Sequence, residues 1–245
     1  MPDYSIYQRA VKPLSDAQIA QYFREGFLVA RGLVPSAAVQ HVLAPIQSIE
    51  PSGDRWTPQI FQHDDPQRDR EFHQLLIEPH LVGAAEQIFE LPARVYYGMV
   101  AIVPAHGGHG LPWHQDNQYD QVLGGALNLF IALCDITPDK AMLWVAPRSH
   151  LGGVQPSKAN ETTASGHREA IVEPENGVPL DGLRAGDVCI FDRSFYHRSL
   201  QNHTGEHRYA YAAQYQADNA RRAVTGEKDP LKMRAADLKK LWESA

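Results

Sequence analysis

The residues of this chain with the clearest capacity for chemistry are a histidine and an aspartate two positions apart, His114 and Asp116. Side chains alternate between the two faces of an extended backbone, so both groups point the same way and Gln115 points away. An imidazole and a carboxylate on one face can hold a divalent metal if a third ligand arrives from elsewhere. Two histidines and one carboxylate that leave open positions are the usual ligands of iron(II) in non-haem oxygenases.

His197 is the leading candidate for the third ligand. It lies 81 residues after Asp116 (197 − 116), so a shared metal must join strands that are distant in sequence. That junction is readily made in a double-stranded β-helix, where facing strands meet. A buried histidine bonded only to backbone carbonyls is the alternative role for His197. The other histidines considered lie in glycine-rich or polar segments, where a surface role is expected for the last two: His106, His109, His150, His203 and His207.

The elements that must position these residues divide the chain into a helical first part and a strand-rich second part. Ser15 and Gln18 form a capping box, and Gly26 closes the helix that they begin. Two stretches rich in glycine and proline, residues 51–70 and 152–181, predict long loops. Apolar or alternating segments predict strands at residues 93–103, 127–134, 142–145, 188–191 and 208–216.

This order of elements favours a single α+β domain over residues 1–245. We expect a helical N-terminal part over about residues 15–90, a β core over about 93–217 and an amphipathic C-terminal helix over about 229–243. The net charge of −6 gives no reason to expect nucleic acid or an anionic membrane surface as a partner. Only two cysteines occur, Cys134 and Cys189, and both lie in apolar runs, which favours a cytoplasmic protein.

Several segments, taken in order, resemble the phytanoyl-CoA dioxygenase family over about residues 15–220. They are residues 114–116, 128–135, 146–150, 185–187 and 197–199, followed by Arg208. That family comprises Fe(II)- and 2-oxoglutarate-dependent oxygenases. The resemblance implies a double-stranded β-helix, a jelly-roll or cupin-like barrel, with the N-terminal helices packed on one sheet. It also implies that His114, Asp116 and His197 hold the iron.

The resemblance further implies that 2-oxoglutarate and O2 are co-substrates. The family's arginine for the far carboxylate of 2-oxoglutarate falls on Arg208, eleven residues after His197. A planar guanidinium can bind a carboxylate through two parallel hydrogen bonds, whereas an ammonium cannot. The resemblance places three further residues beside the co-substrate, and two others share their faces: Ser199, Phe130 and Met99, then Tyr97 and Asn128.

The reaction implied is hydroxylation of an unactivated C–H bond of a small-molecule metabolite, with release of succinate and CO2. Asp116 fills the position where related halogenases have a small residue, which favours hydroxylation over halogenation. Val103 stands where many family members have a lysine, so no lysine contact to the co-substrate is expected. Trp113, Asn117 and Tyr119 flank the first two ligands and are candidates for substrate contact, as are the loops at 51–70 and 152–181.

Three other functions remain open on the sequence. The same residues could produce desaturation, cyclisation or epimerisation, because no motif records where the substrate is attacked. A cupin-like metal-binding protein without catalysis, or a zinc hydrolase, would use similar ligands. An ion pair with Glu206 is the alternative role for Arg208. The sequence leaves the oligomeric state and the substrate open, including a CoA thioester held by scattered cations such as Arg148, Lys158 and Arg168.

Overall fold

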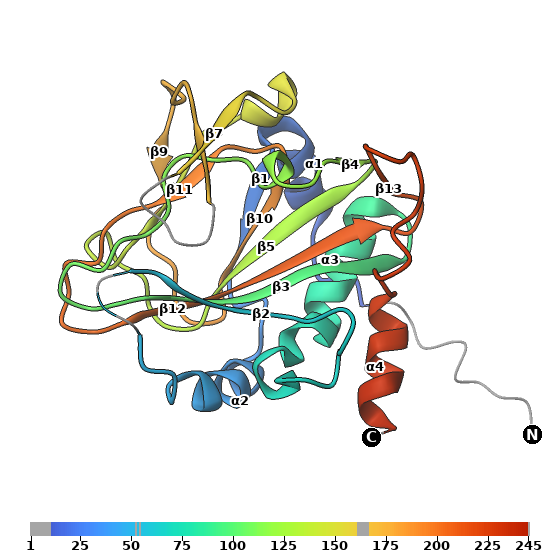
Figure 1. Ribbon diagram of the computed structural model, residues 1–245, viewed down its shortest axis with the longest axis horizontal. Helices are drawn as coiled ribbons and strands as arrows, with labels where there is room; N and C mark the ends of the chain where they lie inside the picture. The colour runs from blue at the N-terminus through green and yellow to red at the C-terminus, as the bar shows by residue number, and fades with distance from the viewer. Residues whose placement is uncertain (1–10, 52, 54, 161–166, 245) are drawn as a thin grey trace, which may run out of the picture.

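The computed structural model describes residues 11–244 except 52, 54 and 161–166. Its centre is an antiparallel six-stranded sheet with the strand order β1-β10-β5-β12-β3-β2 (Figure 1). The strands of this sheet are β1 (Phe27–Ala30), β2 (Thr57–Ile60), β3 (Ala93–Val103), β5 (Ala126–Ala132), β10 (Val188–Asp192) and β12 (Arg208–Ala217).

The remaining strands are short. A three-stranded sheet has the order β11-β6-β9, and two further pairs are β13-β4 and β7-β8. Their bounds are β4 (Val122–Leu123), β6 (Leu143–Val145), β7 (Ser157–Ala159), β8 (Arg168–Ala170), β9 (Val178–Pro179), β11 (His197–Ser199) and β13 (Arg221–Arg222). Strands of two or three residues offer too few backbone pairs to join both edges of the large sheet. Within the described residues the sheets therefore form no closed barrel, which corrects that part of the expected fold.

Three helices lie on one side of the large sheet, α2 (Ser36–Ile46), α3 (Pro79–Phe89) and α4 (Ala235–Glu243), whereas α1 (Asp16–Glu25) lies beside β1 (Figure 1). The predicted capping box of Ser15 and Gln18 is present, and Gly26 ends α1 with a φ of 83°. No helix of the described part is long and apolar enough to span a membrane. The 3₁₀ helices are η2 (Arg70–Phe72), η3 (Gln74–Ile77), η4 (Asp116–Gln118) and η5 (Ser149–Gly152).

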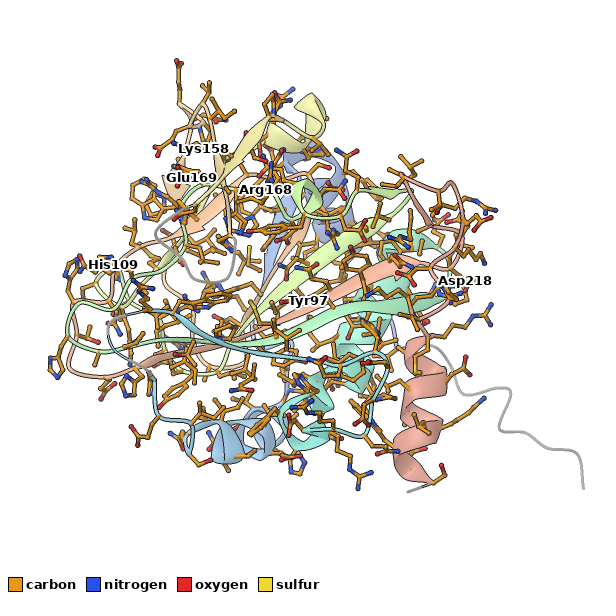
Figure 2. The ribbon with its side chains drawn as sticks, in the orientation of Figure 1. Tyr97, His109, Lys158, Arg168, Glu169 and Asp218 are labelled. Atoms are coloured by element: carbon orange, nitrogen blue, oxygen red, sulfur yellow. The ribbon has the colours of Figure 1, made fainter. Side chains whose placement is uncertain are left out.

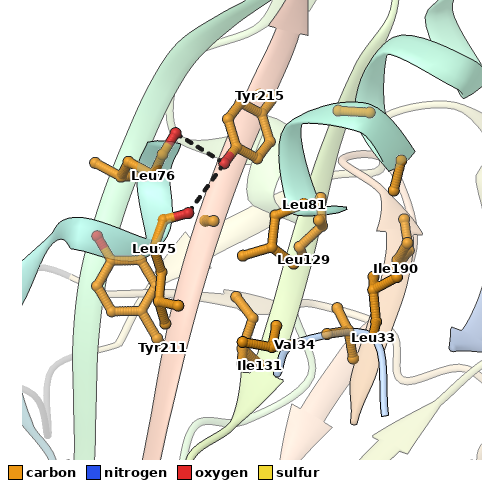
Figure 3. Close-up of a cluster of buried hydrophobic side chains, with 14 of the residues drawn as sticks. Leu33, Val34, Leu75, Leu76, Leu81, Leu129, Ile131, Ile190, Tyr211 and Tyr215 are labelled. Atoms are coloured by element: carbon orange, nitrogen blue, oxygen red, sulfur yellow. Dashed lines mark hydrogen bonds between the residues drawn. The ribbon is translucent and has the colours of Figure 1, made fainter. Parts of the chain in front are cut away.

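The main hydrophobic core lies between this sheet and the helices. Leu129 and Ile131 of β5 and Tyr211 and Tyr215 of β12 project into it (Figure 3). Each buried large apolar side chain contributes about 1.5–3 kcal/mol to folding. The Tyr215 hydroxyl donates to the Leu76 carbonyl at 3.1 Å, so its polar atom is satisfied within the core. The packing of helices on one face of the sheet agrees with the prediction.

The two predicted loops contain strands. Residues 51–70 include β2, which pairs only with β3 and forms the edge of the large sheet. Pro58 hides this strand from sequence reading, because proline cannot donate to a ladder and is tolerated in sheets mainly at edges. Residues 152–181 include β7, β8 and β9, and positions 161–166 lie outside the described residues.

The face of the sheet turned away from the main core builds the site. Because side chains alternate along each strand, every second residue faces this side. The register aligns Met99, Ala212 and Phe130 across β3, β12 and β5. Tyr97 of β3 and Asn128 of β5 form the next such row, with Gln214 of β12 between them.

Candidate active site

His114 and His197 are joined directly by their backbones. Each residue's N–H donates to the other's carbonyl at 3.1 Å, which forms an isolated antiparallel bridge between two distant segments. Asp116 begins η4 two residues after His114. One ligand atom from each of the three residues lies within 4.8 Å of the others, and all three residues are buried. The structure therefore brings the predicted metal ligands together.

The two imidazoles present the same nitrogen to the site. Nδ1 of His114 lies 2.8 Å from the Pro112 carbonyl, and Nδ1 of His197 lies 3.1 Å from the Phe195 carbonyl. A carbonyl only accepts, so Nδ1 carries the hydrogen and the Nε2 lone pair is left for a metal. Burial, followed by the neighbouring His197 and His167, lowers the pKa of His114 well below its usual value. The neutral form that a metal requires is thus favoured.

Asp116 is held so that one carboxylate oxygen stays available. Asn128 donates from Nδ2 to Oδ2 at 2.8 Å, and Oδ1 lies 3.9 Å from Nε2 of each histidine. Arg193 donates to the Asp116 main-chain carbonyl at 2.9 Å, which fixes the backbone as well. Two neutral imidazoles and one oriented carboxylate fit the ligand set of iron(II).

The three ligands open into a cavity of about 350 Å³. Its walls come from the inner face of the large sheet, from β6 and β11, and from the segments around Trp56 and His167. Tyr97 lies near the middle of the molecule, while Lys158 and Glu169 lie on the outer β7–β8 hairpin (Figure 2). The lining residues are Trp56, Pro58, Ile60, Tyr96, Tyr97, Met99, Ala101, Leu111, His114, Asp116, Tyr119, Asn128, Phe130, Leu143, His167, Phe191, Arg193, His197, Ser199, Arg208, Ala212, Gln214 and Lys232.

Arg208 begins β12 and lines this cavity with an unpartnered cation. It is 2% exposed, and its Nε and Nη1 have no hydrogen-bond partner in the described chain. Burial lowers the pKa of Arg208 from its usual value to about 10. The alternative ion pair with Glu206 is not formed, because Glu206 accepts from Lys140 at 2.6 Å. A buried guanidinium without an anion is costly, so this end of the cavity is suited to a carboxylate ligand.

Two further predicted residues support that end. The Arg208 guanidinium carbon lies 5.4 Å from the centre of the Phe130 ring. Ser199 Oγ accepts from Leu111 N–H at 2.9 Å, so its own hydrogen is left to donate to a ligand. A Cβ on Gly110 would come within 2.6 Å of the Ser199 carbonyl, which explains a glycine in this turn. Met99, Tyr97 and Asn128 line the same cavity, as their shared strand faces predicted.

The three candidates for substrate contact occupy different places. Tyr119 lines the cavity, and its hydroxyl lies 2.8 Å from Nδ1 of His167. Trp113 lies outside the cavity lining, packed under the Arg198 guanidinium, whose carbon is 4.9 Å from its ring centre. Asn117 is also outside the lining, where it accepts from Val122 N–H at 2.9 Å and closes the turn after η4.

Several lining residues escaped the sequence reading. Trp56 and His167 come from the two segments predicted as loops, and these segments had been expected to approach the substrate. Gln214 could have been found, because it lies on the same strand face as Arg208, six residues further along β12. Arg193 and Lys232 carry no motif, and only the tertiary structure places them at the cavity.

Comparison with known proteins identifies the class. The family model for phytanoyl-CoA dioxygenase matches residues 22–210. The fold and the ligand set, together with this match, define an iron- and 2-oxoglutarate-dependent dioxygenase. The chain belongs to the phytanoyl-CoA dioxygenase family.

Named relatives cover most of the chain. It is 27% identical to the L-proline trans-4-hydroxylase of Streptomyces griseoviridis over 228 residues, which is 80% of this chain and 84% of that protein. It is 25% identical to the ectoine dioxygenase of Bordetella parapertussis over 224 residues, which is 77% of this chain and 71% of that protein.

Solved structures share the fold. EvdO2 from Micromonospora carbonacea var. aurantiaca aligns with a TM-score of 0.70 at 17% identity, over 89% of this chain and 96% of that one. The α-ketoglutarate-dependent epimerase SnoN from nogalamycin biosynthesis aligns with a TM-score of 0.65 at 22% identity, over 84% of each chain.

Proposed function

We propose that this protein hydroxylates an unactivated C–H bond of a small-molecule metabolite, with 2-oxoglutarate converted to succinate and CO2. The observation that carries the proposal is the buried, unpartnered Arg208 in the same cavity as His114, Asp116 and His197. A protein that only stored a metal would have no use for a second buried cation aimed at an organic anion. A continuous core from Leu14 to Trp242 supports a single domain.

The residues of this chain divide the work. His114, Asp116 and His197 would hold iron(II), which, once bound, supplies the oxidising chemistry with 2-oxoglutarate and O2. Arg208 and Ser199 would bind and orient the far carboxylate of 2-oxoglutarate. Asn128 keeps the Asp116 carboxylate in place at 2.8 Å. Buried apolar lining residues such as Phe130, Leu143 and Phe191 exclude water from the cavity and limit wasteful side reactions.

The size of the cavity supports a small substrate. Its volume of about 350 Å³ is at the lower end of the range of about 300–1,000 Å³ for ligand pockets, and it must hold the co-substrate as well. Two of the three cations considered for a CoA thioester are engaged elsewhere: Lys158 pairs with Glu169 at 2.8 Å, and Arg168 donates to Ser157 Oγ at 2.8 Å. The third, Arg148, does not line the cavity. The relatives named for L-proline and ectoine also act on small molecules.

The test is an anaerobic titration with Fe(II) and 2-oxoglutarate, followed through the weak visible charge-transfer band of a chelated keto acid. We expect the band in the wild type and in the surface variant His203→Ala, and its loss in His197→Ala. Bound iron without a band in the wild type would overturn the proposal. With the band established, succinate release and product analysis would separate hydroxylation from desaturation, cyclisation and epimerisation.

A further inference from the structure

A second cationic region lies at the end of the cavity away from Arg208. Arg193 and Lys232 both line the cavity there and both approach the ring of Tyr96. The guanidinium carbon of Arg193 is 3.9 Å from the ring centre, and Nζ of Lys232 is 4.9 Å from it. Arg193 bonds Gln214, which lies six residues along β12 from Arg208, about 20 Å of strand.

The Arg193 side chain is buried without a carboxylate partner. It is 2% exposed, and it donates to the Gln214 side-chain oxygen at 2.9 Å. Its other acceptors are the main-chain carbonyls of Asp116 at 2.9 Å and Asp120 at 3.3 Å. All three are neutral groups, and Nε has no partner in the described chain. Neutral acceptors only partly offset the cost of burying a cation.

Lys232 adds a second positive charge to the same place. Burial lowers the pKa of Lys232, and Arg193 lowers it further, although Asp229 and Asp120 act in the opposite direction. The Asp120 carboxylate is itself engaged by the Tyr96 hydroxyl at 3.0 Å. No carboxylate in the described ranges forms an ion pair with Lys232, whereas Lys228 in the same segment pairs with Asp218 at 3.5 Å.

The backbone around Lys232 is fixed rather than loosely placed. Arg94 of β3 donates from Nε to the Lys232 carbonyl at 2.6 Å. Asp218, at the edge of the sheet near α4 (Figure 2), pairs with Arg94 at 3.4 Å and with Arg234 at 2.8 Å. These contacts hold the segment before α4 in place, with Lys232 in the lining of the cavity. Lys232 lies beyond residue 210, where the match to the family model ends.

The charges that line the cavity do not balance. The lining holds three basic side chains, Arg193, Arg208 and Lys232, and one carboxylate, Asp116. Under the proposed function Asp116 is taken up by the metal and Arg208 by the co-substrate. Arg193 and Lys232, which also line the cavity, then remain without an anion from the described chain. Trp56 and His167, whose ring centres are 5.8 Å apart, provide aromatic walls beside it.

We propose that the substrate is a small carboxylic acid whose carboxylate binds between Arg193 and Lys232 and whose carbon skeleton extends toward the three metal ligands. This inference rests on the proposed function and specifies its substrate class. A bound carboxylate would offset the positive charges of Arg193 and Lys232, neither of which forms an ion pair with a carboxylate in the described part of the chain. The Tyr96 ring packs against both cations. Binding of the carboxylate at Arg193 and Lys232 would determine which carbon of the substrate faces the metal.

The test uses the Fe(II)–2-oxoglutarate protein under anaerobic conditions. The probes are the proteinogenic amino acids and straight-chain and cyclic monocarboxylates of four to eight carbons, each compared with its primary amide, and a set of small phosphate monoesters. Substrate-site binding is measured as a change in the charge-transfer band. We expect a response to some acids and none to their amides. An equal response to the amides, a response confined to phosphate esters, or no response to any acid would overturn the inference.

Variants locate the binding. Lys232→Met is expected to raise the dissociation constant of each responding acid about tenfold, which is typical for the loss of a hydrogen bond to a charged group. Its 2-oxoglutarate titration should match the wild type. Lys240→Met, on the exposed face of α4, is the control and should change neither. Unchanged affinity for the acids in both Lys232→Met and Arg193→Lys would overturn the inference. If the wild-type protein with Fe(II) and 2-oxoglutarate shows no band before any acid is added, that result counts against the proposed function and not against this inference.

Discussion

Each end of the cavity contains a buried arginine without an anionic partner among the described residues, but the two ends are built from different parts of the chain. At each end a buried arginine has a nitrogen without a partner, Arg208 at one and Arg193 at the other. The Arg208 end is assembled from residues on regular strands, Arg208 of β12, Phe130 of β5 and Ser199 of β11, two residues after a metal ligand. The Arg193 end is assembled from three distant segments that meet at Tyr96. Strand geometry therefore sets the first anion site, and tertiary packing sets the second.

The largest effect that separates the ends is expected from Arg208→Lys. The charge remains, but the planar fork that binds both oxygens of a carboxylate is lost. We expect 2-oxoglutarate to bind about tenfold to a hundredfold more weakly in the anaerobic titration. Iron binding, measured separately by metal analysis after desalting, should stay near the wild-type level.

The counterpart at the other end is Lys232→Arg. A single ammonium contributes there as a point charge, so another cation in its place should change the affinity for a responding acid by less than about threefold. The two variants could instead lose affinity equally, Arg208→Lys for 2-oxoglutarate and Lys232→Arg for a responding acid. That result would contradict the view that one site requires a planar guanidinium and the other only a positive charge.

The metal ligands lie between the two ends of the cavity, and Asn128→Leu tests how the ligand Asp116 is oriented. The variant removes the hydrogen bond to Asp116 Oδ2 while it keeps a side chain of similar size. Partners that orient metal ligands are typically worth about tenfold to a hundredfold in metal affinity. We expect a loss of about tenfold in Fe(II) affinity, measured by competition with a chelator. The affinity for 2-oxoglutarate at saturating iron should change little, and a larger loss there would place Asn128 in the co-substrate site.

A change in stability, not in binding, is expected at an arginine that does have its anion. Arg31 donates to Asp187 at 2.8 Å, and Asp187 also accepts from the N–H groups of Gly32 and Arg184. Burial acts to raise the pKa of Asp187, but these hydrogen bonds outweigh it and the pKa lies below its usual 3.8. Because the folded-state pKa is the lower one, the stabilisation is complete above the unfolded value and is lost as the pH falls through the folded value.

Asp187→Asn should therefore lower the free energy of unfolding by about 1 kcal/mol at pH 7, since Arg31 is half exposed and the pair is partly screened. The difference from the wild type should shrink as the pH falls below about 4, because the pKa of Asp187 lies below 3.8 in the folded state. Urea unfolding at several pH values measures both quantities. A difference that grows in acid would contradict the assignment.

Much of the first end could be predicted because its elements obey local rules. Residues 93–103 were expected to form a strand, and β3 has these bounds. His114, Asp116, His197 and Arg208 occur at spacings that the resemblance recognises, and the structure gathers them in one cavity.

The rest depended on packing that no local rule records. β2 was missed because Pro58 is typical of a loop, and only its pairing with β3 makes it an edge strand that carries Trp56 toward the cavity. Lys232 reaches the cavity because Arg94 and Asp218 hold the chain before α4. Closure of the barrel was expected from the fold of the family, whereas the strands of the smaller sheet are too short to complete it.

The reciprocal backbone bridge between His114 and His197 has a consequence for which ion the protein carries. Hydrogen bonds within the protein orient both imidazoles without a metal. The ligand geometry is therefore preorganised and does not adapt to the ion that binds. A rigid cage of nitrogen and oxygen ligands takes cobalt, nickel, copper and zinc more tightly than iron. The metal found in a purified sample will therefore depend on which ions were available during expression and purification. An inactive preparation can have its site filled with a metal other than iron.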